Sequence, residues 1–221
     1  MKKIITALIV ILSVIQSVYA DDVIYSWNSN SKKIALTFDD GPHPYRTEEI
    51  LDILDEYGVK ATFFVVGENA GWFPEIVKDE YSRGHEIANH SYDHSDMKKM
   101  NVAEIKRQIE AAEKTVYENI EYRTKYIRPP GGVIGTNLLK AAADEDYKII
   151  CWSVDTRDWA HTPVDKIVEN VMTNVEEGDI ILFHDYISGD SPTPAALKII
   201  IPKLLEEGYN FVTVSELLNS N

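Results

Sequence analysis

The segment KIALTFDDGP, residues 33–42, joins an apolar run to two adjacent carboxylates and a Gly-Pro turn. Its first part, Lys33 to Phe38, has the length and composition of a buried β-strand. Six similar runs follow, at residues 60–66, 85–89, 125–128, 148–154, 179–184 and 209–214. Longer segments with helical periodicity separate them, without repeats or low-complexity linkers. This regular alternation predicts an α/β fold with a mainly parallel sheet.

The segments between the runs have the periodicity and the end signals of helices. Apolar faces recur at Ile50/Ile53/Leu54/Tyr57, at Val102/Ile105/Ile109/Ala112/Val116 and at Val164/Ile167/Val168/Val171/Val175. Asn101 with Glu104 resembles a capping box, and Pro74 suits a first helical turn. Glycines that suit helix ends stand at positions 58, 84 and 208.

Polar residues stand at or just past the ends of the predicted strands. They are Asp39, Asp40, His90, Arg128, Asp155 and His184. A doubly wound sheet and a (β/α) barrel both agree with the alternation of elements. A barrel gathers the carboxyl ends of its strands on one face, where active sites of barrels are built, whereas an open sheet spreads them along a crevice. We therefore favour a barrel of about seven parallel strands.

The N-terminus has the pattern of a secretory signal peptide. Lys2 and Lys3 precede an apolar stretch over residues 4–15, and Val18-Tyr19-Ala20 forms a small-x-small cleavage pattern. An uncleaved membrane anchor is the alternative, but the stretch is shorter than the ~20 apolar residues that span a bilayer. We predict a signal peptide at residues 1–20, one catalytic domain at residues 21–221, and a secreted or cell-wall-associated protein without membrane contact after cleavage.

Charge and cysteine content exclude several classes of partner. Cleavage would remove two of the 22 basic residues and none of the 36 acidic ones, so the formal net charge would change from −14 to −16. Such a chain is not expected to bind nucleic acid, which requires clustered cations. Cys151 is the only cysteine, so no internal disulfide forms, and its apolar neighbours indicate a buried residue rather than a nucleophile. We expect a monomer.

Asp39-Asp40 and the segment His90-Ser91-Tyr92-Asp93-His94 together suggest a metal site. Taken alone, the carboxylates are compatible with a surface turn and the imidazoles with an exposed loop. Two histidines four residues apart converge on one ion if their segment is helical, and with Asp40 they make the two-His, one-carboxylate set of catalytic zinc sites. Non-haem iron oxygenases use the same set, so these ligands do not fix the metal.

Three further motifs follow at later strand ends: Arg128-Pro129-Pro130-Gly131-Gly132, Asp155-Thr156-Arg157-Asp158-Trp159 and Leu182-Phe183-His184-Asp185. Each is compatible with a structural role by itself. Their expected placement on the face that carries Asp39 and the histidine pair predicts an active site instead.

In this order the motifs resemble those of the polysaccharide deacetylase family, carbohydrate esterase family 4, which is built on the NodB-homology domain. The resemblance runs from Thr37 to His184 and the flanking strands continue it, so it covers nearly all of the mature chain. It implies a distorted (β/α) barrel with one divalent metal, usually Zn²⁺, although Co²⁺ or another ion is compatible. It further implies a hydrolase of non-peptide carbon–nitrogen bonds that releases acetate from N-acetylglucosamine polymers such as peptidoglycan or chitin-type oligomers.

The resemblance also implies a role for each motif residue. The metal ligands would be Asp40, His90 and His94, with Asp39 as general base and Arg128 as its orienting partner. Gly131 would be a backbone donor to the oxyanion, His184 the general acid and Asp158 the partner of that acid, with Asp155 as the second candidate; Trp159 and Leu182 would form walls of the acetyl pocket. Many relatives have an aromatic residue where Gly131 stands. The remaining histidines, His43, His85 and His161, are predicted to be structural or exposed.

Two alternatives remain at this point. An acetylxylan esterase would release acetate from O-acetylated xylan on the same fold, and a non-catalytic carbohydrate-binding protein would keep the fold without the chemistry. Asp39 and His184 are both present, which favours an enzyme.

Overall fold

The computed structural model describes residues 23–28 and 31–220, so the predicted signal peptide lies outside the described residues. Within those ranges nine strands form one sheet in which every pairing between strands is parallel. The strands are β1 (Val23–Ile24), β2 (Lys33–Asp39), β3 (Thr62–Val65), β4 (Glu86–Asn89), β5 (Tyr126–Ile127), β6 (Lys148–Ile150), β7 (Val154–Asp155), β8 (Ile180–His184) and β9 (Asn210–Val212). Their order is β1-β6-β5-β4-β3-β2-β8-β7, and β9 pairs with the first part of β2.

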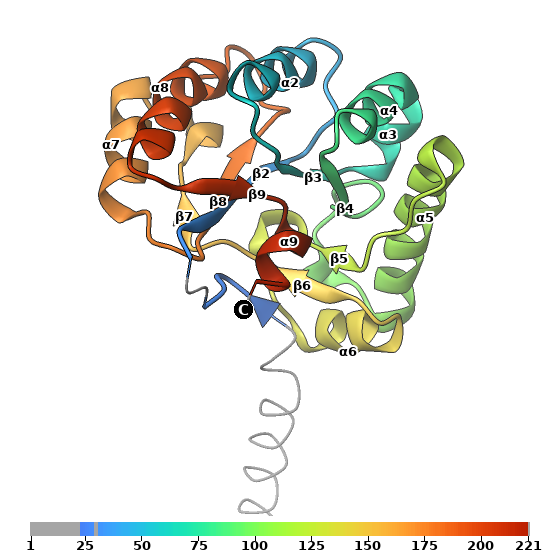
Figure 1. The fold of residues 1–221 in the computed structure, drawn as a ribbon. Coiled ribbons are helices and arrows are strands. Elements are labelled where there is room, and N and C mark those ends of the chain that lie inside the picture. Colours follow the sequence, from blue (N-terminus) through green and yellow to red (C-terminus); the bar gives the residue numbers. More distant parts are fainter. Residues whose placement is uncertain (1–22, 29–30, 221) are drawn as a thin grey trace, which may run out of the picture.

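Helices surround the curled sheet (Figure 1). They are α2 (Arg46–Tyr57), α3 (Gly67–Trp72), α4 (Pro74–Ser82), α5 (Val102–Ile120), α6 (Thr136–Asp144), α7 (Val164–Asn174), α8 (Thr193–Glu206) and α9 (Val214–Leu218), with short 3-10 turns η2 (Met97–Lys99), η3 (Pro130–Gly132) and η4 (Asp158–Ala160). The distorted (β/α) barrel predicted from the sequence is confirmed.

The helix signals read from the sequence are confirmed as well. Asn101 and Glu104 form a reciprocal capping box at the start of α5. Pro74 occupies the first turn of α4, and Gly58 ends α2 in the left-handed conformation that glycine adopts without penalty.

Two strand predictions were wrong in detail. The single run expected at residues 148–154 is divided, because its backbone changes partners: Cys151 N donates to Ile24 O of β1, and Ser153 N donates to Ile180 O of β8. The change of partners separates β6 from β7 and distorts the barrel at this point. β1 was not predicted, since two residues are too few to show a strand pattern.

Alternation along the strands decides which side chains enter the barrel. Leu36 and Phe38 of β2 pack with the helix-facing core, whereas Ala35 belongs to an apolar cluster that fills the interior. Because side chains alternate between the two faces, Thr37 and Asp39 share the interior face with Ala35. The same alternation in β8 places Leu182 and His184 with Ile180, the side chain that joins the interior cluster.

The barrel interior is covered at one end, and the candidate site residues lie at the other. α9 lies across the middle of the ring in Figure 1, and its Val214 and Leu217 are fully buried in the interior cluster. Val214 N donates to Thr62 Oγ1 at the start of β3, so α9 covers the N-terminal ends of the strands. The polar residues at the carboxyl ends are therefore left for the opposite face.

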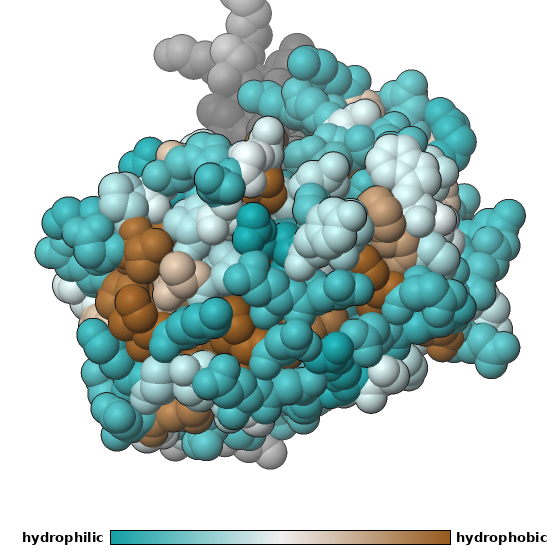
Figure 2. Space-filling view, turned by 90° about the horizontal axis from the view of Figure 1, so that it is seen from above, coloured by the Kyte–Doolittle hydropathy of each residue, from teal (hydrophilic) through white to brown (hydrophobic). Residues whose placement is uncertain are grey.

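One face of the molecule is mainly polar. Figure 2 shows a mostly hydrophilic face on which apolar side chains appear in separate patches. No helix among the described residues has both the length and the apolar character needed to cross a membrane.

Candidate active site

A cavity of about 430 Å³ opens at the carboxyl ends of the strands. Its lining residues come from loops far apart in the sequence: Asp39, Asp40, His90, His94, Gly131, Trp152, Asp155, Trp159, Leu182 and His184. Eight of the ten residues predicted as site residues line it. The other two, Arg128 and Asp158, are buried behind it and hold residues that line it.

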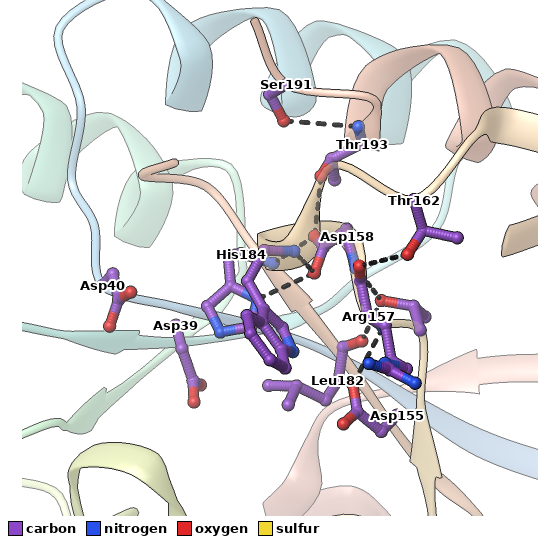
Figure 3. Close-up of polar contacts among 12 residues, drawn as sticks. Asp39, Asp40, Asp155, Arg157, Asp158, Thr162, Leu182, His184, Ser191 and Thr193 are labelled. Carbon is purple, nitrogen blue, oxygen red and sulfur yellow. Dashed lines mark hydrogen bonds and ion pairs between the residues drawn. The ribbon is translucent and has the colours of Figure 1, made fainter. Parts of the chain in front are cut away.

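The adjacent carboxylates Asp39 and Asp40 have different surroundings because the backbone turns between them (Figure 3). Asp39 ends β2 on the interior face and is buried. Asp40 has φ = +77°, an uncommon conformation for a residue with a side chain, which directs its carboxylate to a different neighbourhood. Asp39 Oδ1 accepts a 2.7 Å hydrogen bond from Arg128 Nη1, whereas Asp40 Oδ1 faces the two histidines.

Arg128 is a fully buried cation, and each of its side-chain nitrogens donates to a group inside the barrel. Besides Asp39, Nη1 donates to Thr37 Oγ1 at 2.9 Å, and Nε and Nη2 donate to the carbonyls of Ile150 at 3.2 Å and Cys151 at 2.9 Å. Its guanidinium also lies 4.0 Å from the centre of the Phe64 ring. A buried charge is tolerated when it is paired and hydrogen-bonded, so this network fixes both Arg128 and the orientation of Asp39.

Three ligand atoms converge in the manner required of a metal site. Asp40 Oδ1 lies 3.2 Å from His90 Nε2 and 3.0 Å from His94 Nε2, and Asp40, His90 and His94 can each offer one atom within 4.8 Å of the others. His90 Nδ1 lies 2.8 Å from the Arg128 carbonyl, which can only accept, so Nδ1 carries the proton of the neutral ring. In that neutral form Nε2 presents a lone pair to the buried Asp40 Oδ1, so the two atoms attract each other only when a proton or a cation lies between them.

The electrostatics of this triangle favour a cation. Burial alone would raise the pKa of Asp40, but the imidazoles of His90 and His94 lower it well below its ordinary value. The same contact with Asp40 raises the pKa of His94, against the opposing effect of burial. The carboxylate is therefore ionised, and the residues fit a divalent ion with N and O ligands.

His90 and His94 do not lie on a helix, although a helix was the conformation in which their four-residue spacing was expected to bring them together. Residues 90–94 form a loop after β4 in which Ser91 has φ = +69° and His94 has φ = +57°. Ser91 Oγ accepts a 3.1 Å bond from His94 N, which stabilises the turn. Two left-handed residues therefore bring the imidazoles together where a helical turn was expected, and neither residue type signals this conformation.

His184 on the opposite wall is held by Asp158. Its Nδ1 lies 2.8 Å from Asp158 Oδ1, and its backbone N donates to Asp158 Oδ2 at 2.8 Å (Figure 3). Asp158 also accepts bonds from Thr193 Oγ1 at 2.7 Å and Trp159 N at 2.9 Å, so its orientation is fixed. Burial would lower the pKa of His184, but the Asp158 carboxylate raises it to about 9. Because Nδ1 is held by Asp158, Nε2 is the His184 ring nitrogen left for the cavity.

Asp155, the second candidate partner of His184, has a different place. Its Oδ1 accepts a 2.8 Å bond from Arg157 N, and the residue lines the cavity. Trp152 also lines the cavity but is not among the predicted site residues, because it stands inside the run expected to form a strand at residues 148–154. Its ring lies against Gly132, where an added Cβ would come within 2.5 Å of Trp152 Cη2. The glycine at position 132 is the sequence signal for that close approach.

The three remaining histidines have structural environments. His43 Nδ1 accepts backbone bonds from Tyr45 and Arg46. His85 is buried, and its Nδ1 accepts a bond from Ala61 N. His161 is exposed, with Nδ1 3.1 Å from the Asp190 carbonyl.

Comparisons with known proteins agree on one family. The polysaccharide deacetylase family model matches residues 27–150. A peptidoglycan-N-acetylglucosamine deacetylase of Bacillus cereus is 42% identical over 198 residues, which cover 89% of this chain and 72% of the relative. The crystal structure of the Bc1960 peptidoglycan N-acetylglucosamine deacetylase superposes with a TM-score of 0.87 at 41% identity, covering 90% of this chain and 94% of that one.

A second similar structure is that of a carbohydrate esterase family 4 pseudoenzyme from Bacillus anthracis. It matches with a TM-score of 0.83 at 31% identity and covers 89% of this chain and 69% of that chain. The fold alone therefore does not establish catalysis, and the decision rests on the side chains in the cavity.

Proposed function

The chain belongs to the polysaccharide deacetylase family, and we propose that it hydrolyses the N-acetyl groups of N-acetylglucosamine residues in peptidoglycan, with chitin-type oligomers as further substrates and acetate as the released product. One observation carries the proposal. A carboxylate fixed by a buried arginine, a triangle of three side chains that could hold a metal ion, and a carboxylate-held imidazole all meet at one cavity of about 430 Å³. The names of the similar proteins support the choice of substrate.

Amide hydrolysis makes three demands on such a site: an activated water, a stabilised oxyanion and a proton for the departing amine. A divalent ion, for which we propose Zn²⁺, bound by Asp40, His90 and His94 would lower the pKa of a bound water and polarise the acetyl carbonyl. The ligand set leaves room for water and substrate, as three-ligand catalytic sites do.

Asp39 is the proposed general base. Arg128 occupies its Oδ1, while Oδ2 lies 3.9 Å from His90 Nε2, on the side of the predicted ligands. Because the ion pair fixes Oδ1, Oδ2 faces the predicted ligands in a set orientation and is available to accept the water proton. Gly131, whose backbone lines the cavity, is the proposed donor to the oxyanion.

His184 is the proposed general acid. Asp158 holds its Nδ1, so the proton given to the amine leaves from Nε2. The elevated pKa keeps the ring protonated at neutral pH, which a proton donor requires. Leu182 and Trp159 line the same cavity and would form the apolar walls around the acetyl methyl group.

The proposed place of action is the cell wall, outside the cytoplasm. The predicted signal peptide at residues 1–20 and the peptidoglycan named for the Bacillus cereus relative support it. The protein is proposed to act as a monomer on the acetylated polymer.

Acetate release from three polymers tests the proposal. Purified protein with Zn²⁺ is incubated with peptidoglycan, chitooligosaccharides and acetylxylan, with Asp39→Asn as the inactive control. Acetate from the first two substrates and not from xylan is expected. Acetate from xylan alone would identify an acetylxylan esterase, and Zn²⁺ binding without acetate from any substrate would identify a non-catalytic family member.

The metal content of two variants tests the ligand assignment separately. His90→Ala and His94→Ala are each expected to lose Zn²⁺ on dialysis, because a three-ligand site reduced to two should lose most of its affinity. Stoichiometric Zn²⁺ in both variants would show that the ligands lie elsewhere.

A further inference from the structure

The predicted metal ligands lie on two loops that are not adjacent in the barrel. Asp40 follows β2, whereas His90 and His94 follow β4. β3 lies between these strands and pairs with both. The segment after β3, residues 66–69, supplies no ligand, yet it is the part of the chain that lies between the two ligand loops.

Backbone hydrogen bonds join this segment to both ligand loops. Val66 N donates to Gly41 O at 2.9 Å on the β2 side. Gly67 N donates to Ser91 O at 2.9 Å, and Glu68 N donates to Tyr92 O at 2.8 Å, on the β4 side. The distance between the Asp40 loop and the histidine loop is therefore set by residues 66–68.

The segment is also held from behind. An added Cβ at Gly67 would come within 2.7 Å of the Ala112 Cα of α5 and 2.8 Å of Tyr92 Cδ2. Such distances are below any normal contact, so Gly67 is packed directly against the helix and the histidine loop. The support cannot move toward α5 without moving one of them.

Asn69 extends the support to the ligand residue itself. Its Nδ2 donates a 2.8 Å hydrogen bond to the Asp40 carbonyl, and its side chain is buried, with the residue 7% exposed. Asp40 is held at φ = +77°, a conformation that persists only where the surroundings impose it. The amide of Asn69 contacts the residue whose backbone is unfavourable and whose carboxylate meets both imidazoles.

We propose that Asn69 is a positioning residue of the metal site: by holding the Asp40 carbonyl it keeps the Asp40 carboxylate in register with His90 and His94. The inference rests on the proposed metal site and adds to it a residue that contributes no ligand. Loss of the amide allows the Asp40 backbone to relax toward a common conformation, which moves Oδ1 away from the two Nε2 atoms.

The test compares two asparagines that make the same kind of bond. Asn69→Leu removes the amide while keeping the number and branching of the side-chain heavy atoms. The matched control is Asn119→Leu, because Asn119 Nδ2 donates at 3.0 Å to the Ala70 carbonyl, one residue along, without contacting a ligand residue. Zn²⁺ dissociation constants are measured by competition with a chromogenic chelator. We expect roughly tenfold or greater weakening for Asn69→Leu, as for other residues that support ligands, and less than about twofold for Asn119→Leu.

A spectroscopic readout separates positioning from general destabilisation. The visible absorption of the Co²⁺-loaded protein reports ligand geometry, and it should change in Asn69→Leu and remain as in the parent protein in Asn119→Leu. Asn69→Ala, which removes the amide without adding bulk, is the second variant in case leucine is not accommodated. Unfolding of the metal-free proteins is measured in parallel, and the two leucine variants should lose similar amounts of stability.

The outcomes distinguish this proposal from the proposed function. If His94→Ala loses Zn²⁺ but the Asn69 variants bind it as the parent does, the positioning role is wrong and the site stands. Equal weakening in Asn69→Leu and Asn119→Leu would also overturn the role. If His94→Ala binds Zn²⁺ normally, the site itself is wrong and both proposals fall.

Discussion

Asp39 and Asp40 have the same side chain, and only their surroundings give them different chemistry. Asp39 lies on the interior face of β2 and is paired with the buried Arg128. Asp40 follows a left-handed turn of the backbone and faces two imidazoles. Nothing in the dipeptide itself distinguishes the two carboxylates, so the sequence assigns base and ligand only through the family resemblance.

Exchanging each carboxylate for an amide should separate the two roles. Asp39→Asn is expected to keep Zn²⁺ and the fold but to lower turnover by at least ~10², because the amide cannot accept the water proton. Asp40→Asn should weaken Zn²⁺ binding, with activity partly restored by excess metal. Zn²⁺ affinity and kcat are measured for both. Metal loss in Asp39→Asn with retention in Asp40→Asn would reverse the assignment.

The elevated pKa of His184 predicts the alkaline limit of activity. His184 is a donor only while protonated, so activity should fall as the pH rises through its pKa of about 9. A bound cation would lower this pKa, which makes pH 9 the upper bound of the limb. Asp158→Asn removes the charge that raises the pKa and leaves burial, which lowers it, so the limb should move down by roughly one unit or more.

Asp155→Asn is the control for this shift. Asp155 lines the cavity but makes its carboxylate contact with Arg157 N rather than with His184. The alkaline limb of kcat/KM should therefore stay within about half a unit of the parent value. Equal movement of the limb in both variants would mean that net charge in the cavity, and not the Asp158 contact, controls His184.

For helices and strands, sequence periodicity predicted the elements well, whereas the points at which a strand changes its pairing partner could not be predicted. The apolar run of β2 and the apolar faces of α2, α5 and α7 are local properties, so they could be read from the sequence. The division of residues 148–155 into β6 and β7 depends on which strands lie on either side, which no local pattern encodes. The left-handed turns at Ser91 and His94 could not be predicted either, because the residues that adopt them are not glycines.

The capping boxes of α5 and α9 should contribute stability and not catalysis. In each, an N-cap side chain accepts a backbone N–H that would otherwise lack a partner: Asn101 bonds Glu104, and Thr213 bonds Glu216. Asn101→Ala and Thr213→Ala should each lower the free energy of unfolding by ~1 kcal/mol in urea titrations. kcat should be unchanged in Asn101→Ala, and a large loss there would show that the start of α5 reaches the site.

The whole molecule is strongly acidic, and its charge should affect one substrate more than another. The formal net charge of the chain is −14. Peptidoglycan carries carboxylates on its peptides, whereas chitooligosaccharides are neutral, so only the former is repelled over a distance. Salt screens such repulsion beyond about 10 Å at 0.1 M.

Raising the ionic strength should therefore increase kcat/KM on peptidoglycan roughly twofold or more and leave the value for chitooligosaccharides nearly constant. Initial rates of acetate release from the two substrates across a salt series provide the measurement. A parallel response of both would place the salt effect in the cavity and not in the long-range field.

The pairing of β9 with β2 governs the order in which this barrel can be completed. β2 pairs with β3, β8 and β9, and its partner over Lys33–Ala35 is β9, the last of the described strands, followed by the α9 cover. A chain that emerges N-terminus first must leave one edge of β2, over Lys33–Ala35, without its β9 partner until residues 210–218 arrive. Closing such a distant contact is slow, because the entropy of the whole intervening loop is lost before the pairing is gained. The barrel thus closes late, only after residues 210–218 have been delivered.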